Sequence, residues 1–129
     1  NKMQDKLNAV KEFHTAFKIG YSENMKASLG ESKNLLRFNL MKEENEEYLE
    51  AAQNDDIVEI ADALGDMLYI LCGTIIEHGL QHKIEEVFEE IQRSNMSKLG
   101  EDGKPIYRED GKVMKGPNYF KPNFEDILK

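Results

Sequence analysis

Residues 41–66, MKEENEEYLEAAQNDDIVEIADALGD, crowd carboxylates into two helix-like segments and include a single basic residue, Lys42. From residue 43 to residue 82 the sequence has eleven Asp or Glu residues and neither Lys nor Arg. The whole chain has a net charge of −8, so the residues outside this −11 segment sum to +3. Charged helix faces usually carry both signs. The one-sign segment therefore indicates a special role for its carboxylates.

The composition and the apolar spacing favour an all-α fold. The 129 residues fit one domain, and Glu, Lys, Leu, Ala and Met together outnumber the β-branched and aromatic residues that favour strands. Apolar residues at helical spacing predict helices over about residues 3–19, 31–52, 56–78 and 82–99. Residues 53–56, QNDD, are expected to form a connector with an Asx-type N-cap for the third helix. We expect a single domain over residues 1–129, whose body at residues 1–100 is a bundle of about four helices.

The composition changes from Gly100 onward. This part holds all three prolines and four of the nine glycines. The turn sequence Glu109-Asp110-Gly111 separates two short strand-like segments, and Asp-Gly is a strong hairpin signal. We expect a short β-hairpin and an extended C-terminal tail over about residues 101–129.

Cysteine usage and charge limit the classes of protein. The single cysteine, Cys72, excludes an intramolecular disulfide, and its apolar neighbours indicate a place in the core. No signal peptide is visible, and no apolar run approaches the roughly 20 residues of a membrane span. The negative net charge argues against nonspecific binding to nucleic acid or anionic membranes. We expect a cytoplasmic protein that binds neither.

The carboxylates of the second helix point in two directions. With a step of about 100° per residue, Glu46 and Glu50 share one side, with Glu43 at its edge, and we expect them in solvent. Glu44 and Glu47 fall on the opposite, apolar side, where a lone carboxylate is costly. These two acids therefore need a partner that the neighbouring sequence lacks.

The third helix carries what we call the acid stripe: Glu59, Asp62 and Asp66, at positions i, i+3 and i+7. The stripe continues through Tyr69, and nearly every other position is apolar. A helix that is apolar nearly all round is buried, so its acids line a cleft or pair with another group. Because four helices give too little cover for such a surface, we expect a homodimer or homotetramer.

Acids on two facing helices supply hard oxygen ligands, which suit Mg²⁺ or Mn²⁺. Spacing alone leaves an alternative, in which Glu59 and Asp62 face solvent or pair with lysines of the tail. A di-iron bundle is excluded, because it needs Glu-x-x-His on two helices and no histidine here follows a glutamate at that spacing. The histidines are interpreted as surface or helix-end residues without a role: His14, His78 and His82.

Two blocks resemble a known superfamily. EENEE at residues 43–47, followed by EIADALGDMLY at residues 59–69, resembles the E-E-x-x-E … E-x-x-D signature of the all-α NTP pyrophosphohydrolases. That superfamily includes MazG-like enzymes, dimeric dUTPases and phosphoribosyl-ATP pyrophosphohydrolases. EEIQRSNMSKLGEDGKP and GKVMKGPNYFKP are similar to the phosphoribosyl-ATP pyrophosphohydrolase-like branch. The resemblance runs from about residue 13 to the C-terminus.

The resemblance implies a Mg²⁺-dependent enzyme. Its substrate would be a nucleoside triphosphate or a phosphoribosyl-ATP-like molecule, cleaved between the α and β phosphates to give a monophosphate and pyrophosphate. Glu43 and Glu44 would be the catalytic acids that support or activate a water molecule. The implied metal ligands are Glu44, Glu47, Glu59, Asp62 and Asp66.

The second block allows two alignments. A literal E-x-x-D match makes Glu59 and Asp62 the main ligands. Alignment on GDMLY instead favours Asp62 and Asp66, and it puts Ala63 where many relatives carry glutamate.

The resemblance also implies cations for the outer phosphates, from RSNMSK and from the tail. These substrate-binding residues are Arg93, Asn95, Lys98, Lys112 and Lys115. Tyr69 would stack on the base. The alternatives are solvated charge at a helix end, which the helix dipole favours, and a tyrosine of the core.

Two other functions stay open. One is a catalytically silent bundle that binds a nucleotide or a partner protein, which the alanine at position 63 keeps possible. The other is a purely structural oligomerisation module. The sequence does not identify the nucleotide.

Overall fold

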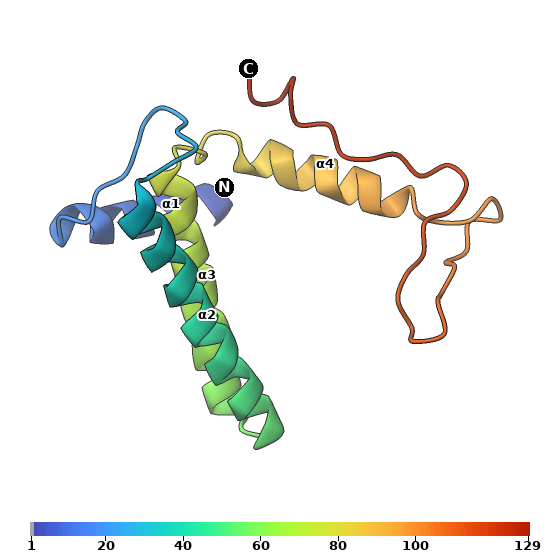
Figure 1. Cartoon of the computed structure of the whole chain (residues 1–129), viewed down its shortest axis with the longest axis horizontal. Helices are drawn as coiled ribbons and strands as arrows, with labels where there is room; N and C mark the ends of the chain where they lie inside the picture. The colour runs from blue at the N-terminus through green and yellow to red at the C-terminus, as the bar shows by residue number, and fades with distance from the viewer. Residues whose placement is uncertain (1) are drawn as a thin grey trace. The chain divides into compact units, whose positions relative to one another are not determined.

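The computed structural model describes residues 2–129, and four α-helices make up its regular structure (Figure 1). They are α1 (Lys2–Ala16), α2 (Glu31–Gln53), α3 (Ile57–Glu77) and α4 (Ile84–Met96). This confirms the predicted all-α class and the four helices. Within residues 2–129 no helix is both long and apolar enough to cross a membrane.

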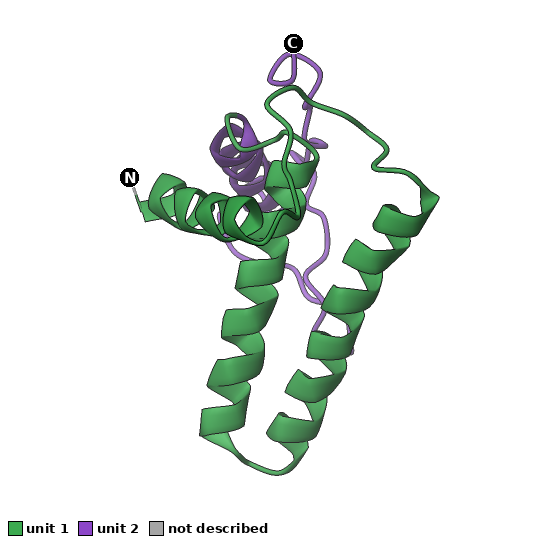
Figure 2. Cartoon of the chain, turned by 90° about the vertical axis from the view of Figure 1, so that its left-hand side faces the viewer, with its two compact units in different colours: residues 1–82 green, residues 83–129 purple. Residues whose placement is uncertain are grey.

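The chain divides into two compact units (Figure 2). Unit 1 runs to His82 and contains α1, α2 and α3, whereas unit 2 spans Lys83–Lys129 and contains α4. Each unit is described by itself below. The prediction of a single domain stays a prediction.

In unit 1, α2 and α3 lie side by side and run in opposite directions, joined by a tight turn (Figures 1 and 2). Asp55 takes a positive φ of 53° in this turn. Asp56 caps α3, because its side chain accepts a hydrogen bond from the backbone N–H of Glu59 at 3.2 Å. The expected Asx-type cap is therefore confirmed. Ala51 and Ala63 are buried on the two helices, and their small side chains permit close packing near the turn.

The core of unit 1 lies where α1 packs on the C-terminal half of α3. Its most buried apolar side chains are Leu7 and Val10 of α1 and Cys72 and Ile76 of α3. Cys72 is thus a core residue, as predicted, and burial raises the pKa of its thiol.

The single chain leaves one side of α3 uncovered, which agrees with the expectation that four helices give this helix too little cover. Four large apolar residues are 43–73% exposed; we call them the apolar stripe of α3, and they are Ile57, Leu64, Leu68 and Leu71. Their spacing puts them together on the side of α3 opposite the acid stripe. Neither α1 nor α2 covers this side, so the apolar pattern of α3 exceeds what one chain can bury.

The predicted β-hairpin is wrong, since residues 2–129 contain no strand. The Asp-Gly turn forms, but it is closed by one isolated antiparallel bridge between Tyr107 and Val113. The backbone N–H of Arg108 donates to the carbonyl of Lys112 at 2.8 Å. Every residue of this loop is exposed, so no buried face stabilises longer strands.

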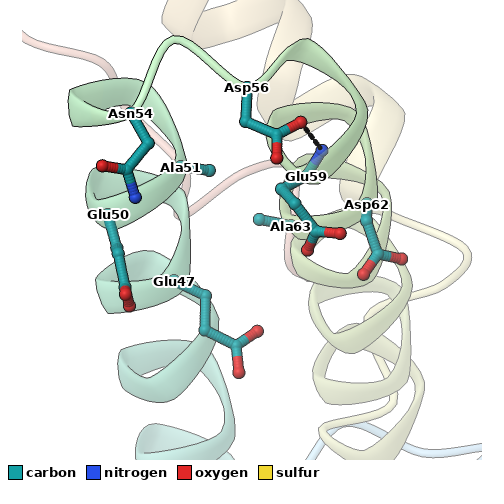
Figure 3. Close-up of a pocket in the computed structure, with 8 residues that line it drawn as sticks. All are labelled: Glu47, Glu50, Ala51, Asn54, Asp56, Glu59, Asp62 and Ala63. Atoms are coloured by element: carbon teal, nitrogen blue, oxygen red, sulfur yellow. Dashed lines mark hydrogen bonds between the residues drawn. The ribbon is translucent and has the colours of Figure 1, made fainter.

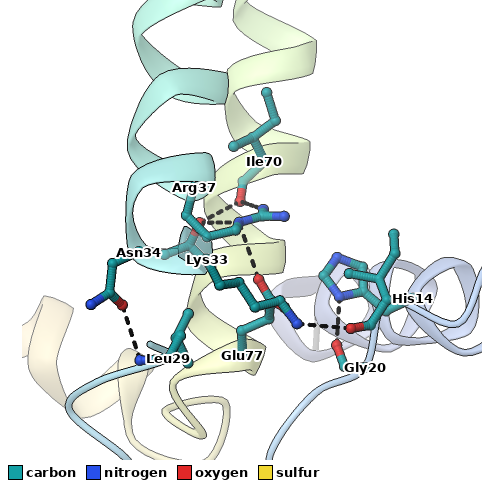
Figure 4. A network of polar contacts seen from close by, with 10 residues as sticks. His14, Gly20, Leu29, Lys33, Asn34, Arg37, Ile70 and Glu77 are labelled. Atoms are coloured by element: carbon teal, nitrogen blue, oxygen red, sulfur yellow. Dashed lines mark hydrogen bonds and ion pairs between the residues drawn. The ribbon is translucent and has the colours of Figure 1, made fainter. Parts of the chain in front are cut away.

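A buried ionic cluster joins α2 to α3. We call it the Glu77 cluster: Glu77, Lys33 and Arg37 (Figure 4). The Glu77 side chain is 2% exposed, and its carboxylate lies 2.5 Å from Lys33 Nζ and 3.2 Å from Arg37 Nε. Arg37 also donates to Thr74 Oγ1 at 3.0 Å and to the carbonyl of Ile70 at 2.8 Å. The cluster therefore fixes the start of α2 against the end of α3.

His14 extends this polar core. It lies in the last turn of α1, so its interpretation as a helix-end residue is confirmed, but it is buried and not on the surface. Its side chain is 2% exposed, and Nδ1 lies 2.9 Å from the carbonyl of Gly20. Because a carbonyl only accepts, Nδ1 carries the proton. A Cβ at Gly73 would lie 2.6 Å from Arg37 Nη2 and 2.8 Å from His14 Nε2. Because Gly73 has no side chain, Arg37 and His14 can both lie close to α3 at this position.

Glu77→Gln should lower the free energy of unfolding by about 3 kcal/mol, because it leaves buried Arg37 without its counter-charge. Urea denaturation followed by circular dichroism measures this change. The matched control is Glu12→Gln, an exposed glutamate of α1, which should change stability by less than about 0.5 kcal/mol. The double variant Arg37→Met with Glu77→Met should recover much of the loss; equal losses in Glu77→Gln and Glu12→Gln would contradict the assigned role.

Candidate functional site

A pocket of about 380 Å³ opens between α2 and α3, next to the turn that joins them (Figure 3). Most of the groups that line it are polar, and five of them are carboxylates of glutamate or aspartate, contributed from both sides. The lining residues are Glu47, Glu50, Ala51, Asn54, Asp56, Glu59, Asp62 and Ala63. In Figure 3 the Glu47 side chain extends from α2 toward α3.

The structure brings most of the predicted metal-binding acids to one place. Glu47, Glu59 and Asp62 line the pocket. Glu44 and Asp66 are outside the lining, but they are close enough for the Asp66 charge to act on Glu44. The ligand roles of these five residues stay predictions.

Glu43, the other predicted catalytic acid, is exposed and does not line the pocket. Glu50 is exposed, as predicted, but it also lines the pocket. Sequence reasoning did not assign Asn54 to the site, and it gave Asp56 only a capping role. Their position in the turn between the acid blocks was the signal for both.

The Glu44 carboxylate is electrostatically perturbed. Its pKa is raised to about 7, first by burial, then by a hydrogen bond with Glu47 and by the negative charges of Asp66, Glu47 and Asp62. Glu44 Oε2 is inaccessible to solvent and has no hydrogen-bond partner in residues 2–129. A group with this pKa holds or releases a proton near neutral pH.

Within the described part of unit 1, no basic side chain forms an ion pair with these acids. Among the ion pairs of the described part of the chain, none involves Glu44, Glu47 or the acid stripe. Glu77, the next acid of α3, has its counter-charges in Lys33 and Arg37. The pocket therefore concentrates negative charge that this part of the chain leaves uncompensated.

The donor set fits a hard cation that needs few protein ligands. In the described residues no three His, Cys, Asp or Glu side chains converge closely enough to hold a metal ion. Mg²⁺ typically takes only one or two carboxylates and fills its other positions with water and phosphate oxygens. Glu44 has an unpartnered Oε2, and Glu47 of α2 and Asp62 of α3 line the pocket from its two sides, so these acids can supply the few carboxylates that Mg²⁺ needs. The described residues form no metal site closed by protein side chains alone.

The predicted phosphate-binding residues belong to unit 2. Arg93 lies 2.9 Å from Glu90 and stacks over the ring of Phe120 at 4.6 Å. Lys115 lies over the ring of Tyr119 at 4.9 Å. These contacts are local to unit 2, and a phosphate-binding role stays a prediction for all five residues: Arg93, Asn95, Lys98, Lys112 and Lys115.

The raised pKa of Glu44 predicts a pH-dependent stability in metal-free buffer. Between the ordinary glutamate value of 4.5 and about 7, the folded chain binds a proton that the unfolded chain has released. The stabilisation from this protonation is therefore complete below about pH 4.5 and is lost as the pH rises through 7. Glu44→Gln removes the effect, so its Tm relative to the parent chain should rise between pH 5 and pH 8.

Thermal unfolding in EDTA at several pH values measures this difference. Glu46→Gln, an exposed neighbour on α2, is the control, and its Tm difference should not vary with pH. A Tm difference for Glu44→Gln that stays constant across this range would contradict the assigned perturbation.

Comparison with known proteins identifies the family of this chain. A model of the family "Phosphoribosyl-ATP pyrophosphohydrolase" matches residues 10–95, about two thirds of the chain and the whole pocket lining. A crystal structure of a candidate NTP pyrophosphohydrolase from Exiguobacterium sp. 255-15 is 34% identical, with a TM-score of 0.49. The alignment covers 74% of this chain and 60% of that protein. No curated protein gives a significant match. The family match confirms the resemblance of the acid blocks: the chain belongs to the phosphoribosyl-ATP pyrophosphohydrolase family, within the all-α NTP pyrophosphohydrolase superfamily.

Proposed function

We propose that the chain is a Mg²⁺-dependent nucleotide pyrophosphohydrolase. It would cleave a nucleoside triphosphate, or a phosphoribosyl-ATP-like substrate, between the α and β phosphates to give a monophosphate and pyrophosphate. The observation that carries this proposal is the uncompensated negative charge at the pocket between α2 and α3. Family membership supports the reaction class.

Glu47, Glu59 and Asp62 would hold the cation at the pocket, with Glu44 and Asp66 beside them. Mn²⁺ has similar ligand preferences and could replace Mg²⁺. When bound, the cation would neutralise charge on the phosphate oxygens and orient the phosphate chain. The carboxylates alone would repel a polyphosphate, so metal and substrate binding should be coupled.

Glu44 is suited to move the proton of the attacking water. Its raised pKa lies near neutral pH, where a general base is most effective. As the water oxygen bonds to one phosphorus, Glu44 would take the proton. The α–β bridging oxygen would leave with the other phosphorus. Glu43 would act only in support, because it lies outside the pocket lining.

One observation favours a second candidate, a silent bundle that binds a nucleotide without hydrolysing it. Ala63 lines the pocket and is buried. On the alignment that places glutamate at this position in many relatives, the pocket lacks one acid. Asp66 is the aspartate of the motif on this alignment, so Asp62, one turn before it, would have to replace the missing glutamate.

We also propose that the chain forms a homodimer or homotetramer. The apolar stripe of α3 is 43–73% exposed, and α2 exposes Leu35, Phe38 and Leu49 by 54–61%. Exposed apolar surface of this extent marks an interaction face. A second copy offers the same faces and would bury them by symmetry.

Hydrolysis is tested by measuring pyrophosphate release from nucleoside triphosphates, deoxynucleoside triphosphates and phosphoribosyl-ATP, with and without Mg²⁺. Release should require the metal. Asp66→Asn combined with Glu47→Gln should lower kcat/KM by about 100-fold or more, since even indirect supports of a metal site cost 10- to 100-fold. Glu46→Gln is the control and should leave the rate unchanged.

The possible outcomes separate the candidates. Binding of a nucleotide without pyrophosphate release would favour the silent bundle. Release that survives the double substitution would contradict the assigned acids but not the reaction.

The oligomer is tested by sedimentation velocity. The parent chain should sediment as a multiple of its 14.9 kDa mass, and Leu64→Ser with Leu71→Ser should shift it toward the monomer. Met25→Ser changes an exposed apolar residue of the loop before α2 and serves as the control. A parent chain that sediments as a monomer would refute the proposal.

A further inference from the structure

Three aromatic rings form a continuous exposed cluster on unit 1, which we call the aromatic platform: Phe13, Phe17 and Tyr69. The centroids of Phe13 and Phe17 are 4.6 Å apart at a tilt of 39°. The ring of Tyr69 meets Phe13 edge to face, at 5.6 Å and 80°. The three side chains are 38%, 67% and 43% exposed, so large ring surfaces stay open after they pack on each other.

The platform is adjacent to the acids along α3. Tyr69 continues the acid stripe, one turn beyond Asp66 and two turns beyond Asp62. With a rise of about 1.5 Å per residue, the axial distance to Tyr69 is about 4.5 Å from Asp66 and about 10 Å from Asp62. The platform therefore begins one to two helical turns from the acids that would hold the phosphates.

The rings are held on a rigid support. Phe13 is followed by buried His14, which is fixed to the Gly20 carbonyl. The backbone N–H of Ile19 donates to the His14 carbonyl at 2.8 Å, and Lys33 of the Glu77 cluster donates to the Ile19 carbonyl at 2.9 Å. The end of α1 is therefore fixed to the buried ionic core, so the platform is formed before any ligand binds.

We propose that the aromatic platform stacks the nucleobase of the substrate. Phe13 and Phe17, at the end of α1, would then bind the base together with Tyr69. The inference rests on the proposed function, because the acids must first hold the phosphates. Stacking on aromatic rings tolerates different bases, since every base has a π face. The platform therefore supplies affinity for a base in general rather than selection of one base.

The test uses the absence of tryptophan from the chain. Phe17→Trp introduces one tryptophan on the platform, which can be excited selectively at wavelengths where tyrosine does not absorb. A nucleoside triphosphate with Mg²⁺ should quench it, whereas inorganic triphosphate with Mg²⁺ should not, because it lacks a base. Phe38→Trp places the control fluorophore on an exposed position of α2, on the side opposite Glu47, and neither ligand should quench it.

Kinetics supply the second readout. Phe17→Leu and Tyr69→Leu should each raise the KM for the nucleotide about 10- to 100-fold, the range expected from losing one stacking contact. Inhibition by inorganic triphosphate should not change. Equal weakening of nucleotide and triphosphate, or no change in either, would overturn the platform.

The two proposals fail in different ways. If no nucleotide is hydrolysed but base-dependent quenching occurs, the hydrolase proposal fails and the platform stands. If hydrolysis occurs without quenching and without a KM change, the platform fails alone. Dissociation of the oligomer in Phe17→Leu, with an unchanged KM, would assign the rings to a subunit interface and overturn the proposal.

Discussion

The interaction on which unit 1 depends is the buried ion pair of Glu77 with Arg37, supported by Lys33. A carboxylate this inaccessible is tolerated only with well-placed opposite charge and hydrogen bonds. Burial lowers the pKa of Arg37, and the Glu77 charge opposes that shift. Arg37 also uses its other donors on α3, so the pair sets how α2 and α3 lie together. The geometry of the pocket at their other end follows from this placement.

Charge is distributed unequally along α3. At the C-terminal end, one acid is neutralised by two basic side chains from α2. At the N-terminal end, the acid stripe faces more acids of α2, and no basic side chain of the described residues of unit 1 pairs with it. The fold tolerates this repulsion because the rest of the interface between α2 and α3, including the Glu77 cluster, holds the two helices together. Groups of like charge with a shifted pKa, such as that of Glu44, occur preferentially at functional sites.

Several differences between the sequence pattern and the structure have one cause. Periodicity reports which residues share a side of a helix, but it does not report what covers that side. The apolar stripe of α3 shows this, because its pattern is that of a buried helix and yet most of it is exposed in the single chain. The reverse holds for His14, which lies on a helix of low hydrophobicity but is enclosed by Arg37 and Gly73. The turn at Gly111 forms without strands, because no face of the loop is buried.

The sequence by itself determined the all-α class, the four helices, the cap at Asp56 and the set of acids that share a side, because these depend on local spacing. It also contained the motifs of the family. Only the tertiary structure decided which acids line the pocket, which acid is neutralised by the protein and how strongly Glu44 is perturbed. Those properties depend on distances between residues of different helices. One helical period fixes the side on which a carboxylate lies, but the packing of α2 on α3 decides what that carboxylate meets.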